Sequence, residues 1–153
     1  MKITKKTEDR IKASVPKFQK VLGIAKDRDL NESEINSVEL GNIMDEALAA
    51  TPRIAYYRVR AKIEGHETFT YGLVLCAAKG TSMYDELVSR EPSRRTVPAC
   101  QMRTRTIGAT LRQTAGRMHD IGCLTTEPDL YLFATINPDT IDFLESIMTD
   151  LPK

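Results

Sequence analysis

The chain has 153 residues, 41% of them hydrophobic and 28% charged, and its formal net charge is +1. This length fits a single domain over residues 1–153, with residues 1–10 frayed, and the composition is typical of a folded globular protein and not of a disordered one. Because the sequence contains no membrane-length apolar run and no signal-peptide pattern, we expect an intracellular, cytoplasmic protein. Its three cysteines have wide spacings, which favour reduced core thiols over a disulfide framework.

The N-terminal third predicts two amphipathic helices. Hydrophobic residues recur at helical spacing up to Lys26, but Pro16 interrupts the pattern, so the better-formed part of the first helix is placed at residues 17–26. The second helix is predicted over residues 31–50, with an N-cap at its first or third residue. Residues 27–30 are then expected to form a linker between the two helices.

An antiparallel hairpin is the clearest strand pattern in the chain. Residues 53–64 alternate between hydrophobic and polar side chains, a glycine and a histidine form the turn, and residues 67–78 return with a matching pattern. We expect one face of this hairpin to be buried and the other to be solvated. The solvated face of its first strand would carry three cations in a row, Arg58, Arg60 and Lys62.

The second half of the chain mixes short helices and strands. The predicted elements are, in order, a short helix over residues 82–88, a short strand over 96–102, a helix from Arg103 to a stop signal at Gly122, a strand over 130–136 and a helix over 139–151. The predicted fold class is therefore α+β, a small, mostly antiparallel sheet with helices packed on one side.

Positive charge is concentrated in residues 90–122, which hold seven arginines and two acidic residues. Residues 118–153 have the opposite balance, with seven acidic residues and one lysine. Guanidinium groups bind phosphate well because their planar fork donates two parallel hydrogen bonds and keeps its charge at any working pH. The arginines therefore predict an anion-binding surface, unless the protein's own acidic tail neutralises them. The predicted contacts are Arg94, Arg95, Arg103, Arg105 and Arg112, extended by Arg58, Arg60 and Lys62 of the hairpin.

Residues 17–47 contain Phe18-Gln19, Ala25-Lys26, the run Arg28-Asp29-Leu30-Asn31-Glu32-Ser33 and Met44. They resemble the N-terminal region of restriction-type nucleases related to type I restriction R subunits. The resemblance implies that the following hairpin carries an Asp and a Glu-x-Lys that bind a metal ion, the PD-(D/E)XK site. Here Lys79 matches the lysine, but Ala77 stands at the glutamate position and Arg58 lies near the expected aspartate. Because a divalent metal needs carboxylate oxygens as ligands, the resemblance implies a scaffold without its metal site.

Residues 103–133 are similar to the recognition helix and wing of winged-helix proteins. The similarity rests on the run Thr104-Arg105-Thr106-Ile107-Gly108-Ala109-Thr110-Leu111-Arg112, on Arg117-Met118-His119, on Gly122-Cys123-Leu124 and on the strand pattern at 130–133. It implies a winged-helix-like C-terminal half whose helix enters the major groove of DNA while the wing contacts the backbone. The preceding helix would lie in residues 93–102, where two prolines disfavour it.

No group of residues with a recognised catalytic or metal-binding pattern stands out in the sequence. His66 and His119 are the only histidines, no cysteines and histidines have zinc-site spacing, and no glycine-rich phosphate loop occurs. We therefore predict no catalytic residue, metal or cofactor, and expect a non-enzymatic protein that binds nucleic acid or another polyanion. Two alternatives stay open. One is a protein-interaction or inhibitory module of a mobile element that acts as a homo-oligomer, and the other is a divergent restriction-like nuclease.

Overall fold

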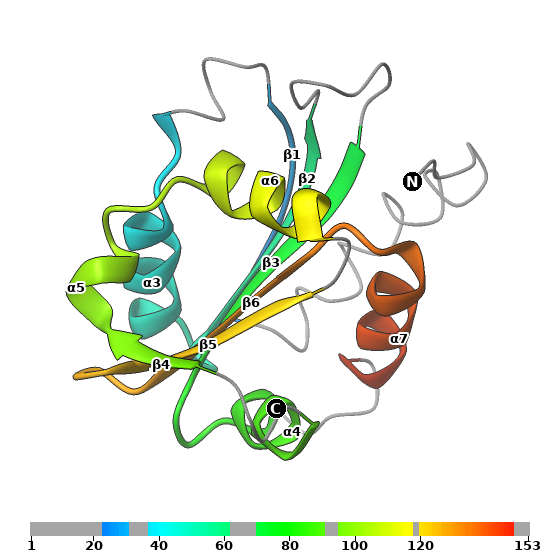
Figure 1. Ribbon diagram of the computed structural model, residues 1–153. Coiled ribbons are helices and arrows are strands. Elements are labelled where there is room, and N and C mark those ends of the chain that lie inside the picture. The colour runs from blue at the N-terminus through cyan, green and yellow to red at the C-terminus, as the bar shows by residue number, and fades with distance from the viewer. Residues whose placement is uncertain (1–22, 31–36, 62–69, 91–94, 118–119, 149–153) are drawn as a thin grey trace.

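A single six-stranded mixed sheet organises the computed structural model (Figure 1), in the order β1-β2-β3-β6-β5-β4. The described residues are 23–30, 37–61, 70–90, 95–117 and 120–148. The strands are β1 (Ile24–Leu30), β2 (Ile54–Ala61), β3 (Thr70–Ala78), β4 (Arg95–Pro98), β5 (Ile121–Thr126) and β6 (Leu130–Thr135). The helices are α3 (Leu40–Ala49), α4 (Ser82–Arg90), α5 (Ala99–Met102), α6 (Ile107–Arg117) and α7 (Pro138–Met148). Within these ranges, no helix is both long and apolar enough to cross a lipid bilayer.

Three of the five strand pairings are antiparallel. Strand β3 pairs with β2 and with β6, and β6 also pairs with β5, each time in antiparallel register. The two outermost strands run parallel to their neighbours, β1 beside β2 and β4 beside β5. The α+β class and the mostly antiparallel sheet predicted from the sequence are confirmed.

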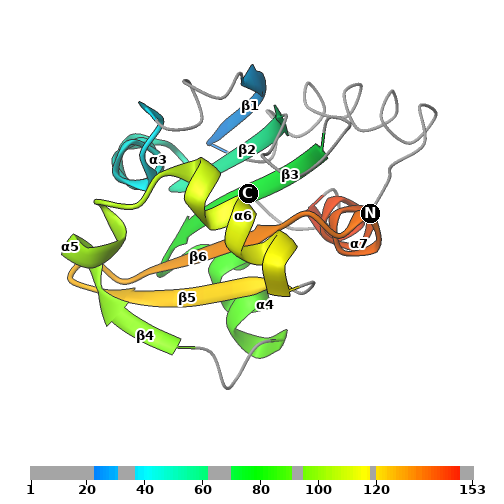
Figure 2. The same cartoon turned by 45° about the horizontal axis from the view of Figure 1, so that its top comes forward.

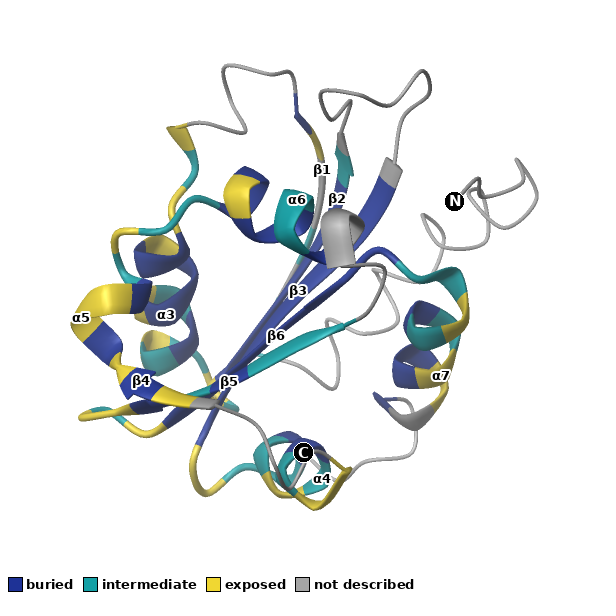
Figure 3. Ribbon diagram, viewed as in Figure 1, coloured by how far each residue is buried: buried dark blue, intermediate teal, exposed yellow. Residues whose placement is uncertain are grey.

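Helices cover both faces of the sheet, so the prediction of helices on one side is wrong. Buried side chains of α3, α5 and α6 pack on one face, and those of α4 and α7 pack on the other. Figure 2 shows α6 crossing the front of the sheet while α4 passes behind it. The central strands are consequently buried along both sides, as the dark ribbons of Figure 3 show. Every described residue of β3 and β6 with an assigned burial is buried.

The two halves of the chain repeat one arrangement. Each half runs strand, crossover helix, strand, strand, helix, with α3 linking the parallel strands β1 and β2, and α5 and α6 linking the parallel strands β4 and β5. The halves meet at β3 and β6, whose antiparallel pairing relates them by an approximate two-fold axis. Helix α4 contacts β6, and α7 contacts β3, so each half also supplies a helix to the other half's central strand.

In the N-terminal third, the prediction is wrong for the described part of the first helix and for the linker, and it is confirmed for most of the described part of the second helix. Residues 24–30, assigned to a helix end and a linker, form strand β1, which pairs in parallel with β2. Within the predicted helix of residues 31–50, Leu40–Ala49 form α3, and Glu39 just before it forms a backbone bridge with Thr106. Residues 1–22 and 31–36, which hold most of the first predicted helix and the start of the second, lie outside the described residues.

The hairpin of β2 and β3 is confirmed, as are α4, β6 and α7. Residues 96–102, predicted as one short strand, divide between β4 and α5. Strand β5 was missed, because Gly122 was interpreted as a helix stop and the residues after it as an exit from the helix. The hairpin of β5 and β6 is part of the central sheet, and each of its described β6 residues is buried. A winged-helix arrangement needs this hairpin free to contact DNA, so that expectation is wrong.

Candidate functional site

Arg58 is not an anion-binding residue, and this corrects the prediction. Its side chain is 1% exposed and points into the helix-covered face of β2, where its guanidinium donates hydrogen bonds to Glu145 Oε1 from Nε at 2.9 Å and from Nη2 at 2.8 Å. The Tyr56 hydroxyl joins the same cluster, accepting from Arg58 Nε and donating to Glu145 Oε1, each at 2.7 Å. The positive charge of Arg58 is therefore used inside the protein, where it links β2 to α7.

Of the other two cations of the predicted hairpin face, only Arg60 is described, and it is largely covered. Arg60 is about a quarter exposed and lies 3.8 Å from Asp29 of the neighbouring strand β1. Lys62 lies outside the described residues, as does Arg94, and the placement of the Arg95 side chain in β4 is not described either. The expectation of a solvated face was wrong because α7 covers that side of the hairpin.

The segment from β4 to the end of α6 contains the other predicted contacts. We call residues 95–117 the basic crossover, since they connect two parallel strands and hold five arginines with no acidic residue. Arg103 lies just after α5, Arg105 lies in the turn before α6, and Arg112 lies in α6. All three side chains are partly exposed.

The turn between α5 and α6 is held in place by the start of α3. The Leu40 amide donates to the Arg105 carbonyl at 2.8 Å, and the Ile107 amide donates to the Val38 carbonyl at 2.9 Å. Thr106 caps α6 by accepting a hydrogen bond from the Ala109 amide at 3.0 Å. The guanidinium groups on this turn are therefore attached to a fixed backbone, and less ordering is needed when they bind a ligand.

The three arginines have different partners. Arg103 Nη1 donates to Asp45 Oδ1 of α3 at 2.5 Å, so one carboxylate neutralises it at the protein surface. Arg105 donates to the Gln113 side-chain oxygen, which keeps its position without cancelling its charge. Arg112 Nε donates to the Gly108 carbonyl at 3.3 Å. Surface ion pairs such as that of Arg103 with Asp45 contribute little to stability, so a competing anion can replace the carboxylate.

The sheet separates the basic crossover from the acidic C-terminal helix. The apolar residues Ile107 and Leu111 of α6 belong to the core on one face, and Ile141 and Leu144 of α7 belong to the core on the other. The acidic residues of α7 therefore do not pack against the arginines of α6, and one of them, Glu145, is already paired with Arg58. Neutralisation of the arginines by the C-terminal acidic residues, which the sequence left open, is not what the described part of α7 does.

The three positions that the nuclease resemblance aligned with a metal site do not come together. In the pairing of β2 with β3, Arg58 lies opposite Leu73 and Ala77 lies opposite Ile54. Arg58 is therefore four residues along the hairpin from the level of Ala77, roughly 13 Å at the usual rise of a strand. Lys79 lies beyond the end of β3 and is exposed.

Comparison with known proteins finds no match to the chain, either among protein families, among curated proteins or among solved structures.

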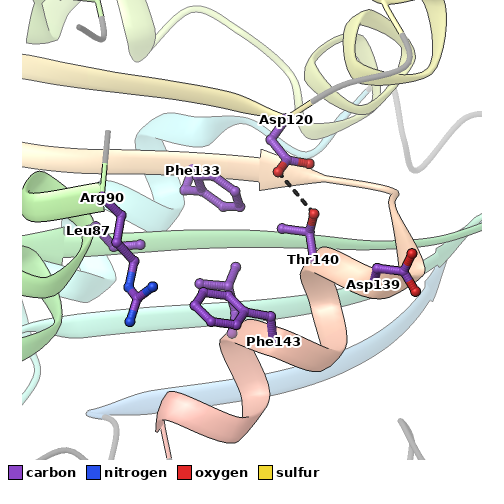
Figure 4. A pocket seen from close by; sticks show the side chains of 8 residues that line it. Leu87, Arg90, Asp120, Phe133, Asp139, Thr140 and Phe143 are labelled. Carbon is purple, nitrogen blue, oxygen red and sulfur yellow. Dashed lines mark hydrogen bonds between the residues drawn. The ribbon is translucent and has the colours of Figure 1, made fainter. Parts of the chain in front are cut away.

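A pocket that the sequence did not reveal lies on the opposite face from the basic crossover, between α4, β6 and α7 (Figure 4). It has a volume of about 310 Å³. Its lining combines apolar walls with both signs of charge: Leu87, Arg90, Asp120, Phe133, Asp139, Thr140, Phe143 and Leu144. These residues come from three separated parts of the chain, so no local pattern in the sequence could have predicted them.

One further cluster, that of Lys26, Glu46 and Tyr57, and the buried thiol of Cys76 have a structural explanation. Lys26 Nζ lies 2.7 Å from Glu46 Oε1, and the Tyr57 hydroxyl also donates to Glu46. The hydrogen bond to Glu46 raises the pKa of Lys26, and burial raises the pKa of Tyr57. Burial likewise raises the pKa of the Cys76 thiol to about 12, which suits the predicted reduced core thiol. Of the other two cysteines, Cys123 is buried, but Cys100 is exposed on α5, so the prediction of a core thiol is wrong for Cys100.

Proposed function

We propose that the protein binds nucleic acid or another polyanion through the basic crossover. The observation that carries this proposal is that Arg103, Arg105 and Arg112 are partly exposed in a segment without acidic residues, on the opposite face of the sheet from α7. Two neighbouring acidic residues, Glu39 and Asp45, moderate the charge of this segment, and only Asp45 has a direct ion pair with it among the described contacts. The basic crossover keeps a net positive charge that can attract phosphate groups.

The proposed contacts are Arg103, Arg105 and Arg112. Arg105 is the central one, because its backbone is fixed by α3 and its side-chain partner is neutral. Arg103 would exchange Asp45 for a phosphate, and such an exchange replaces one charge-assisted hydrogen bond with another. Contacts of this kind fix a protein on the phosphate backbone without selecting a base sequence, so we expect binding with little sequence preference.

The test is fluorescence anisotropy with a labelled single-stranded RNA and a labelled DNA duplex, each at about 50 and 200 mM salt. We expect affinity to fall with salt and the Arg105→Gln/Arg112→Gln variant to bind about tenfold more weakly, with a salt slope reduced by about 1–2. The matched control is Arg53→Gln/Lys79→Gln, which removes two exposed cations elsewhere on the protein. The proposal fails if the wild type does not bind either nucleic acid at low salt, or if both double variants lose the same affinity.

A further inference from the structure

The pocket between α4, β6 and α7 has the size and apolar lining of a small-molecule site. Its volume of about 310 Å³ lies at the lower end of the range of ligand pockets, roughly 300–1,000 Å³. Phe133 projects from β6 into the pocket, and Phe143 projects from α7 to meet it from the other side, as Figure 4 shows. Leu87 and Leu144 complete the apolar walls.

Phe143 adds an independent observation. Its exposure is 42%, and it is the one large hydrophobic side chain that the described residues leave exposed. Complete burial of a side chain of this size provides about 1.5–3 kcal/mol, so covering the part of the ring that is still exposed would provide a fraction of that free energy. The ring therefore adds apolar surface to the wall of the pocket, beside the Arg90 guanidinium that lies over it.

Two carboxylates give one end of the pocket a negative charge. Asp120 accepts hydrogen bonds from the hydroxyls of Thr135 and Thr140, the latter at 3.0 Å, one at each carboxylate oxygen. These neutral donors hold the carboxylate in place without cancelling its charge, and they use only two of its roughly four acceptor positions. Asp139, in the first turn of α7, lines the same pocket and is exposed.

The positive group in the pocket has a carboxylate partner. Arg90 pairs with Glu86 one helical turn away at 2.5 Å, and its guanidinium lies over the Phe143 ring with its carbon 4.4 Å from the ring centroid. This contact shows that the Phe143 ring face accepts a cation in this geometry. The lining therefore holds two carboxylates, Asp120 and Asp139, against one guanidinium that also has Glu86 beside it, so its net charge is negative.

We propose that this pocket binds a small organic cation, an ammonium or amidinium group carried on an aromatic or aliphatic body. The body lies between Phe133 and Phe143, and the cationic head donates hydrogen bonds to Asp120 and Asp139. This site is on the opposite face of the sheet from the basic crossover, so it does not depend on the binding of nucleic acid.

The experiment uses three naphthalene compounds that share one ring system and differ in charge: the cation of 1-naphthylmethylamine, the neutral 1-naphthalenemethanol and the carboxylate 1-naphthaleneacetate. Their binding to the full chain is measured by isothermal titration calorimetry. We expect the amine to bind at least tenfold more tightly than the alcohol, and the acetate to bind most weakly. A Kd of the amine above about 1 mM, or equal Kd values for the amine and the alcohol, would overturn the proposal.

Variants locate the site. Asp120→Asn/Asp139→Asn should lower the affinity for the amine at least tenfold while changing the affinity for the alcohol little, and Phe143→Leu should weaken both compounds by about fivefold. The matched control is Asp142→Asn, which removes the same charge from the same helix outside the pocket lining. If the double variant does not fold, Asp139→Asn alone gives the answer. Unchanged affinity for the amine in these carboxamide variants would rule out the assigned site.

Discussion

The buried cluster of Arg58, Tyr56 and Glu145 should be among the most sensitive points of the fold. The Arg58 side chain is 1% exposed and that of Glu145 is 9%, so neither charge is solvated by water. Replacing Glu145 with leucine removes the carboxylate that accepts two hydrogen bonds from the guanidinium, and leaves a cation in an apolar layer. Breaking a buried ion pair in this way typically costs about 3–5 kcal/mol, because the remaining charge keeps its full desolvation penalty.

Urea unfolding followed by circular dichroism measures this effect. With a slope of about 2 kcal/mol per molar urea, the Glu145→Leu variant should unfold at a urea concentration about 1.5–2.5 M lower than the wild type. Removing both charges with Arg58→Met/Glu145→Leu should restore most of the loss, since no unpaired charge then remains. As a control, Glu86→Gln breaks the partly exposed pair with Arg90 on α4 and should cost less than about 0.5 kcal/mol. A Glu145→Leu protein within about 1 kcal/mol of the wild type, or a double variant no more stable than the single one, would refute this reasoning.

Three other predictions concern single side chains. Cys100 is exposed, whereas Cys76 is buried and its burial raises its pKa to about 12. Iodoacetamide at about pH 8 should therefore label Cys100 and not Cys76 in the native protein. Labelling of Cys76 in the native protein, seen by peptide mass spectrometry, would contradict this prediction. Burial raises the pKa of Tyr57 above 10.0, so the stability that its protonated hydroxyl contributes is complete below the unfolded-state pKa and is lost as the pH rises through the folded-state pKa. The Tyr57→Phe variant should therefore lose less stability than the wild type as the pH rises above about 10. Urea unfolding that shows the same pH dependence for both proteins would contradict this prediction. A Cβ on Gly122 would lie 2.2 Å from the Tyr131 hydroxyl oxygen, so Gly122→Ala should cost about 1–3 kcal/mol in thermal unfolding, and adding Tyr131→Phe should recover part of it.

The parts of the fold that were predictable have local causes. The hairpin follows from the alternation of side chains in β2 and β3, and α7 follows from its apolar spacing and from Asn137, whose side chain accepts a hydrogen bond from the Asp139 amide at 3.0 Å. Strand β1 has no such local cause. Its sequence is mostly polar, and it becomes a strand because β2 offers a parallel edge to pair with. The propensities of the residues in a strand do not predict pairing of this kind.

The interpretation of Arg58 shows where reasoning from side-chain alternation stops. A cation at every second position is typical of a solvated strand face, and Arg58 fits that pattern. Its partner Glu145 lies 87 positions later in the chain, so the sequence gives no indication that α7 covers this face. The same holds for the pocket, where Arg90 and Phe143 meet only because α4 and α7 pack on the same side of the sheet. By contrast, the clustering of arginines was visible in the sequence, and only their partners had to come from the structure.

The repeated arrangement of the two halves has a consequence for how the chain behaves when it is cut. Only β3 and β6 join the sheet across the middle, so a fragment that ended after α4 would expose the whole hydrogen-bonding edge of β3. Exposed edges of this kind recruit other strands, and a second copy of the fragment could supply one through the approximate two-fold relation. We therefore expect such a fragment to self-associate, and a mixture of the two separated halves to prefer each other.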